Sequence, residues 1–139
     1  MLTEQFHEFL SKNRLLPFSL YWERIEVNHI DILENKLRVK MKQEITKTTG
    51  KTVKGLYVYY NASGGCLYVG EGMISNRIRD HYNESHNEKY KNKYKKWFDF
   101  FSTNLGLLTV YWMAYDDEIE RKAIEAMLTK VLKPKYKYP

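Results

Sequence analysis

The sequence feature that most constrains the fold is a pair of short apolar runs separated by a polar turn. The first run, Gly55–Tyr60, and the second, Cys66–Gly70, are rich in tyrosine, valine and leucine, and two adjacent glycines lie between them. Such runs favour β-strands, and a glycine-containing loop of this length is typical of a β-hairpin. Because side chains alternate along a strand, pairing the runs can bring Tyr57 and Tyr68 onto one face. The sequence therefore predicts a hairpin that carries two neighbouring phenols.

After the hairpin, the sequence predicts a helix that begins at Ser75 or Asn76 and is broken by the polar segment 83–87. Arg77 and His81 are four residues apart, which is about one helical turn. The two side chains therefore share one face of this helix.

A third strand and a final helix follow. Leu107–Tyr115 is nearly continuously apolar, which predicts a strand in the centre of its sheet. Asp116 is the predicted N-cap of the last helix, with further acidic residues in its first turn. This helix runs to Leu132, and Lys133-Pro134 ends it. Its predicted buried face consists of Ile119, Ala123, Ile124, Met127, Leu128 and Val131.

The first fifty residues carry weaker structural signals. Thr3 is predicted to cap a helix that ends before Pro17. Residues 20–34 are apolar without a clean period, and we interpret them as weakly helical. Apolar and basic residues alternate over 36–42, which predicts a strand, and the polar stretch Ile45–Lys54 is interpreted as a loop into the hairpin.

Length and composition indicate one folded, basic domain. The chain has 139 residues, 43% of them hydrophobic, which is enough for a single core. The net charge of +6 favours a polyanionic partner, although many small proteins are basic only for solubility. A single cysteine, Cys66, excludes an intramolecular disulfide framework and a cysteine-based zinc site. It lies in a predicted strand, so we interpret it as a small core residue rather than a nucleophile.

Two segments combine basic residues with the predicted elements. Positions 36 to 54 contain seven lysines and arginines but only one acidic residue, Glu44. This favours a surface that follows nucleic-acid phosphates over a merely solvated strand face. Segment 90–101 interleaves lysines with aromatic residues at helical spacing. We interpret its aromatic residues as the buried stripe of an amphipathic helix, with base-stacking platforms as the alternative.

The sequence also predicts where the protein resides. No segment approaches the 18 consecutive apolar residues of a membrane span. Residues 1–5 are acidic and polar, unlike the basic and then apolar start of a signal peptide. We therefore expect an intracellular protein without a membrane segment.

Glu125 is the acidic residue of greatest interest on the last helix. Glu118, Arg121, Lys122 and Glu125 share its polar flank at spacings of one and two turns. On the helix pattern alone, Glu125 is a surface carboxylate paired with Arg121 or Lys122.

Several of these residues, taken in order, resemble the motifs of the GIY-YIG nuclease superfamily. The matching residues are Gly55-Leu56-Tyr57, then Tyr68-Val69-Gly70 with ten residues between the paired tyrosines, then Arg77 with His81, and Glu125 followed by Lys133-Pro134. The match covers about residues 53–139, which leaves residues 1–52 as an N-terminal extension packed on or beside the core. The resemblance implies an α/β fold of the α+β kind: a small three-stranded antiparallel sheet flanked by helices, with a helical and strand extension before it.

The resemblance also implies a metal-dependent endonuclease that hydrolyses phosphodiester bonds in DNA. Glu125 would be the single protein ligand of Mg²⁺ or Mn²⁺. Arg77 would clamp the scissile phosphate. Tyr57 would be the general base or orient the attacking water, although an unperturbed phenol is a poor base at neutral pH. Tyr68 would bind phosphate or polarise the water, and His81 would either collect the Tyr57 proton or hold phosphate.

Further substrate contacts follow from the same resemblance. Gly55 and Gly70 would let the backbone approach its neighbours or the substrate. Lys54 and Lys137 are candidate phosphate contacts, and Lys137 stands where many members of the superfamily have asparagine. Glu71 occupies a position that is often basic in the superfamily, where it either adds a metal contact or weakens nucleic-acid binding.

The departure at Lys137 supports an alternative function. A catalytically inactive nucleic-acid-binding or interaction domain would keep the fold without the activity. If the enzyme is active, one metal site cuts one strand at a time. Cleavage of both strands then requires a homodimer or two successive nicks.

Overall fold

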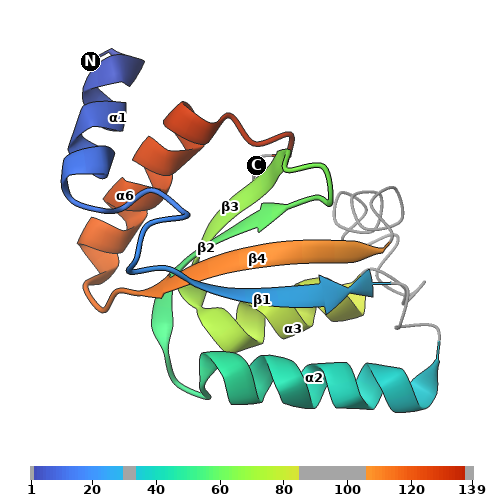
Figure 1. Cartoon of the computed structure of the whole chain (residues 1–139). Coiled ribbons are helices and arrows are strands. Elements are labelled where there is room, and N and C mark those ends of the chain that lie inside the picture. The colour runs from blue at the N-terminus through green and yellow to red at the C-terminus, as the bar shows by residue number, and fades with distance from the viewer. Residues whose placement is uncertain (1, 30–33, 85–105, 137–139) are drawn as a thin grey trace.

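The computed structural model describes residues 2–29, 34–84 and 106–136, which form a mixed α+β structure as the sequence predicts. The elements of this part of the chain, in order, are α1 (Thr3–Lys12), β1 (Glu23–Asn28), α2 (Asn35–Thr49), β2 (Lys54–Tyr60), β3 (Cys66–Met73), α3 (Ile74–Glu84), β4 (Leu107–Ala114) and α6 (Glu118–Leu132) (Figure 1). None of the helices in the described ranges has the length and apolar character needed to cross a membrane.

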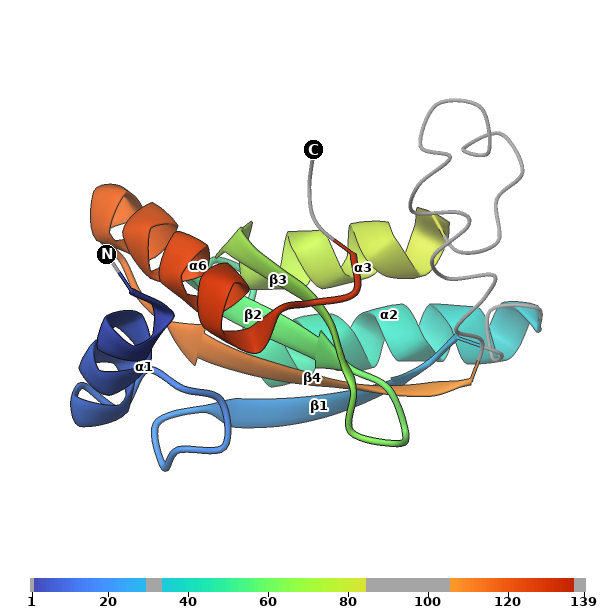
Figure 2. The same ribbon diagram turned by 90° about the horizontal axis from the view of Figure 1, so that it is seen from above.

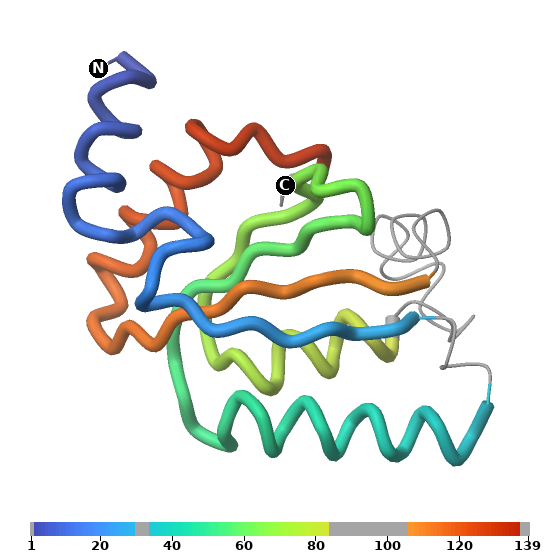
Figure 3. The backbone as a smooth tube through the Cα atoms, in the orientation of Figure 1, coloured from blue at the N-terminus to red at the C-terminus, as the bar shows by residue number. Residues whose placement is uncertain are grey.

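The four strands form one antiparallel sheet in the order β1-β4-β2-β3. The predicted hairpin of β2 and β3 and the central position of β4 are both confirmed. The expectation of three strands is wrong, because β1 pairs with β4 although it comes from the other end of the chain (Figure 3). Within β1, Ile25 and Val27 are buried while Arg24 and Glu26 are exposed. The interpretation of residues 20–34 as weakly helical is therefore wrong for Glu23–Asn28, because the apolar residues on either side obscured this short two-residue period.

The segment 36–42 is wrongly predicted as a strand, and 45–49 wrongly as a loop, because both belong to α2. Leu37 and Val39, which suggested alternation, are exposed. The buried or core-facing residues of α2 are Met41, Ile45 and Thr49, which recur every four residues as a helix requires. The side chain of Glu34 caps the helix by accepting hydrogen bonds from two backbone N–H groups of its first turn.

The sheet is covered by helices on both faces. On β2, Tyr57 and Tyr59 belong to a core shared with α2 and α3, whereas Leu56, Val58 and Tyr60 belong to a second core shared with α1 and α6. In Figures 1 and 2, α2 and α3 run side by side, and α1 lies next to α6. The strand β3 forms one edge of the sheet, where α3 and α6 approach it from opposite faces.

The boundaries of the remaining helices differ slightly from the predicted ones. Leu2, rather than Thr3, is the N-cap of α1, and Asp117, rather than Asp116, caps α6 through a hydrogen bond to the Glu120 N–H. Ile119 and Ala123 were predicted to be buried on the last helix, but both are exposed, Ile119 to 82%. The predicted aromatic helix at 90–101 lies outside the described residues.

Candidate functional site

Two phenols and an imidazole meet on the face of the sheet that α3 covers. Tyr57 lies on β2, Tyr68 on β3 and His81 on α3, and each is at most 6% exposed. The Tyr57 Oη and His81 Nε2 atoms are 2.9 Å apart, within hydrogen-bonding distance. The ring centroids of Tyr57 and Tyr68 are 6.1 Å apart, and those of Tyr68 and His81 are 5.8 Å apart. The sequence correctly placed the two phenols on one face.

Tyr59 is a member of this cluster that the sequence analysis did not single out. It pairs directly with Tyr68 across the hairpin, and its ring centroid is 5.9 Å from that of His81. Its position two residues after Tyr57 on a strand places it on the same face, which is the signal that identifies it. The polar cluster therefore rests on three tyrosines rather than two.

The glycines of the two motifs have packing roles. In β3, Gly70 pairs with Tyr57, and a Cβ atom at this position would lie 2.3 Å from Tyr57 Cζ. In β2, a Cβ at Gly55 would lie 1.9 Å from the backbone oxygen of Met113 on β4. Gly70 therefore makes room for the Tyr57 ring, and Gly55 allows β2 and β4 to pair closely.

We expect Gly70→Ala to lower the free energy of unfolding by about 1–3 kcal/mol and to displace the Tyr57 phenol from His81. The ring cannot simply swing outward, because it is 2% exposed and packed among other aromatic rings. Urea denaturation would measure the loss. Gly65→Ala is the matched control, since its Cβ would meet only the Asn61 side chain, at 3.1 Å. Equal stability losses in the two variants would contradict the packing role of Gly70.

Arg77 and Glu125 lie at the β3 edge, near the Tyr57 phenol. Arg77 is exposed on α3, and its Nε would be 3.1 Å from a Cβ at Gly72, so its side chain lies against the edge strand. Glu125 is half-buried on α6. Both charges influence the pKa of Tyr57, and Arg77 also influences that of Glu125. Glu125 is thus close enough to Tyr57 and Arg77 for their charges to interact, although α6 and α3 cover opposite faces of the sheet.

Burial and charge change the pKa values of two of these groups. The pKa of Tyr57 is raised well above 10, first by burial and then by the Tyr68 and Tyr59 phenols, with Arg77 opposing the rise. The pKa of Glu125 is raised by burial and by the negative charge of Glu71, while Arg77 and Lys122 oppose this. Tyr57 is therefore a neutral phenol at neutral pH. With the phenol O–H as donor, His81 Nε2 accepts the hydrogen bond and is placed to accept the proton as well.

Glu71 and Arg121 form an ion pair that the sequence did not predict. The Arg121 Nε donates to Glu71 Oε2 at 2.7 Å, and the side chains are 6% and 16% exposed. Arg121 Nη1 also donates to the backbone carbonyls of Tyr115 and Asp116, at 3.1 and 2.8 Å. Arg121 was assigned to the polar flank of α6 as a partner for Glu125, and it is instead buried against β3.

Lys54 and Lys137 are the two lysines that the sequence suggested as phosphate contacts. Lys54 is exposed at the start of β2. The pKa of Glu118, at the start of α6, is lowered first by a hydrogen bond and the charge of Lys122. The charge of Lys54 makes a smaller contribution in the same direction. Lys137 lies outside the described residues.

The carboxylates at this edge suit a hard divalent cation. The pKa of Glu125 is raised by its burial and then by the negative charge of Glu71, and a bound cation would offset both effects. Within the described ranges, no three histidine, cysteine or acidic side chains gather into a metal-binding group.

A scan against protein-family models, a search of curated proteins and a search of solved structures each gave no match.

Proposed function

We propose that this protein is a divalent-metal-dependent endonuclease that hydrolyses phosphodiester bonds in DNA with a GIY-YIG-type site. The observation that carries this proposal is the convergence of Tyr57, His81, Arg77 and Glu125. These residues come from three separate elements, and they combine a hydrogen-bonded phenol–imidazole pair with one cation and one carboxylate. Phosphodiester hydrolysis needs a proton acceptor, a positive charge on the phosphate and a metal ligand, and this cluster supplies all three.

Arg77 and Glu125 bind the two charged partners of the reaction. Arg77 is exposed and permanently charged, so it can hold the scissile phosphate and stabilise the charge that develops on it. Glu125 holds Mg²⁺ or Mn²⁺ through hard carboxylate oxygens. The metal, when bound, acts as a Lewis acid on the phosphate oxygens.

Tyr57 and His81 handle the proton of the attacking water. The raised pKa of Tyr57 excludes a free phenolate as the resting base. The phenol oxygen instead accepts a hydrogen bond from water while its O–H points to His81 Nε2, 2.9 Å away. As the water oxygen bonds to phosphorus, its proton moves to the Tyr57 oxygen and the phenolic proton moves to His81. The bond from phosphorus to the 3′-oxygen breaks, and this oxygen leaves with a proton from solvent, which gives 5′-phosphate and 3′-hydroxyl ends. The imidazole is thus the final acceptor, and Tyr57 relays the proton and orients the water.

We expect the purified protein to nick supercoiled plasmid when Mg²⁺ or Mn²⁺ is added, and to stop when EDTA removes the metal. Nicked circles should accumulate before linear DNA, because one site cuts one strand at a time. The activity should disappear in Arg77→Ala and Glu125→Gln and persist in Arg24→Ala, which removes an exposed arginine from the far edge strand β1. DNA binding without cleavage at any concentration of either metal would contradict the enzyme and favour the inactive binding domain.

A further inference from the structure

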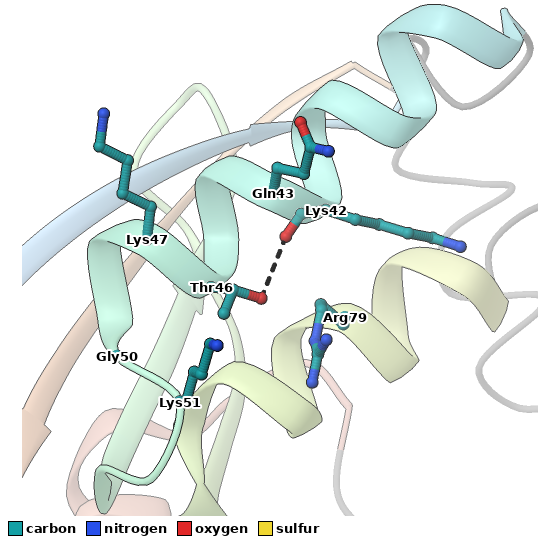
Figure 4. A pocket seen from close by; sticks show the side chains of 7 residues that line it. All are labelled: Lys42, Gln43, Thr46, Lys47, Gly50, Lys51 and Arg79. Atoms are coloured by element: carbon teal, nitrogen blue, oxygen red, sulfur yellow. Dashed lines mark hydrogen bonds between the residues drawn. The ribbon is translucent and has the colours of Figure 1, made fainter.

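A basic groove runs between α2 and α3, apart from the cluster around Tyr57. It has a volume of about 480 Å³. Figure 4 shows it from close by: Thr46, Lys51 and Arg79 lie around the space between the helices, whereas Lys47 and Gln43 project away from α3. The lining residues are Lys42, Gln43, Thr46, Lys47, Gly50, Lys51 and Arg79. Four of the seven are cationic and none is acidic, so the groove is positively charged along its length.

The cations of the groove are not neutralised within the described part of the chain. Lys42, Lys47 and Lys51 form no ion pair there, and Arg79 donates only to the Ser75 carbonyl and the Asn76 side chain, at 3.3 and 2.6 Å. The pKa of Lys42 is lowered by burial and by the charges of Arg38 and Arg79. Holding like charges this close costs free energy, and an anion that enters the groove would recover it.

We propose that this groove binds the phosphate backbone of the DNA substrate at a distance from the scissile phosphate. This proposal rests on the proposed nuclease function, and it adds a second contact with the same substrate. The link between the two sites is α3, which presents Arg77 to the catalytic cluster and Arg79 to the groove. A helix is about 10–12 Å across, which corresponds to the rise of roughly three nucleotides of one strand. A backbone that leaves Arg77 can therefore reach the groove within a few nucleotides.

The chemistry of the lining favours a phosphate backbone over other polyanions. None of the seven residues has a large apolar or aromatic side chain. A membrane-surface helix requires such side chains to enter the lipid, and a protein interface requires them as binding anchors. Flexible lysines and one arginine without apolar anchors are typical of contacts with nucleic-acid phosphates.

Binding of a short fluorescein-labelled DNA duplex, followed by anisotropy between about 50 and 200 mM salt, tests the proposal. Every protein carries Glu125→Gln and is measured in EDTA, so that the duplex stays intact. The groove variant is Lys42→Gln/Lys51→Gln. The matched control is Arg24→Gln/Lys130→Gln, which removes two exposed cations from β1 and α6 and lowers the net charge by the same amount. Thermal unfolding verifies that both variants are folded.

We expect the groove variant to bind the duplex at least about tenfold more weakly. The slope of log K against log salt concentration should become shallower by about 2. The control should keep the affinity and slope of the parent. Equal losses of DNA affinity in both variants would mean that only net charge matters, and would overturn the proposal that the groove binds DNA. A groove variant that binds DNA normally but loses binding to poly-glutamate or to phosphatidylserine vesicles would assign the groove to an acidic protein or a lipid surface, and would also overturn it.

The two proposals fail in different ways. If the wild type nicks plasmid but the groove variant binds DNA as well as the control does, the proposal for the groove is wrong and the proposed nuclease function is retained. If the wild type never nicks but the groove variant alone loses DNA affinity, the nuclease is wrong and the groove is supported as part of a binding domain.

Discussion

Glu125→Gln is expected to reduce plasmid nicking by about 10³-fold or more and, at the same time, to stabilise the folded protein at neutral pH. The amide has the shape of the carboxylate but carries no charge, so it cannot hold the cation. A loss of 10³ corresponds to about 4 kcal/mol of transition-state stabilisation, which is within the range expected of a catalytic metal. Initial rates of nicking with Mg²⁺ measure this loss.

The gain in stability follows from the raised pKa of Glu125. Burial and the neighbouring charge of Glu71 raise the pKa of this carboxyl above its ordinary value of 4.5, so the folded protein binds the proton more tightly than the unfolded chain does. Protonation therefore stabilises the fold. This contribution is complete below the ordinary pKa and is lost as the pH rises through the raised pKa. At pH 7 without metal, the ionised carboxylate destabilises the fold relative to a neutral glutamine.

Thermal unfolding in EDTA at several pH values measures this effect. The variant should melt above the wild type at pH 7, and the difference should vanish below about pH 4. Glu23→Gln makes the same chemical change at an exposed position of the far edge strand β1 and should alter neither nicking nor melting. A Glu125→Gln protein that melts below the wild type at pH 7 would show that the carboxylate stabilises the fold, and would argue against a strained metal ligand.

The elements with strong local signals were predictable from the sequence. The hairpin follows from two apolar runs and a glycine turn, and β4 follows from one continuous apolar run. The hydrogen bond between Tyr57 and His81 agrees with one of the two roles that the resemblance left open for His81, and no local pattern chose between them.

Other features depend on tertiary contacts that sequence patterns do not contain. The sequence of α2 predicts a strand because Leu37 and Val39 alternate with basic residues. In the structure these two side chains are exposed, and the helix packs on the core through the face that carries Ile45. β1 is a strand only because β4 offers it a partner. Arg121 has a helical spacing typical of a surface residue, and its burial depends on Glu71, fifty residues earlier. Local periodicity cannot report such a pairing.

Arg121→Met is expected to lower the free energy of unfolding by about 3–5 kcal/mol, the largest stability effect that we predict. The substitution leaves the largely buried Glu71 carboxylate without its partner and two backbone carbonyls without their donor. The melting temperature should fall by roughly 10 °C or more. Lys122→Met, on the neighbouring exposed position of the same helix, removes only a surface ion pair with Glu118 and should cost less than about 1 kcal/mol.

Most of this loss should be recovered by Arg121→Met/Glu71→Leu, because replacing a buried ion pair with apolar side chains is often nearly neutral, whereas removing one partner is not. A double variant as unstable as Arg121→Met alone would contradict the pairing. The same double variant also tests whether Glu71 adds a metal contact, which is one of the two roles that the sequence left open for it. If it folds and still nicks DNA, Glu71 serves mainly to tie β3 to α6. If it folds and no longer nicks, Glu71 belongs with Glu125 at the metal, and Arg121 is the residue that positions it.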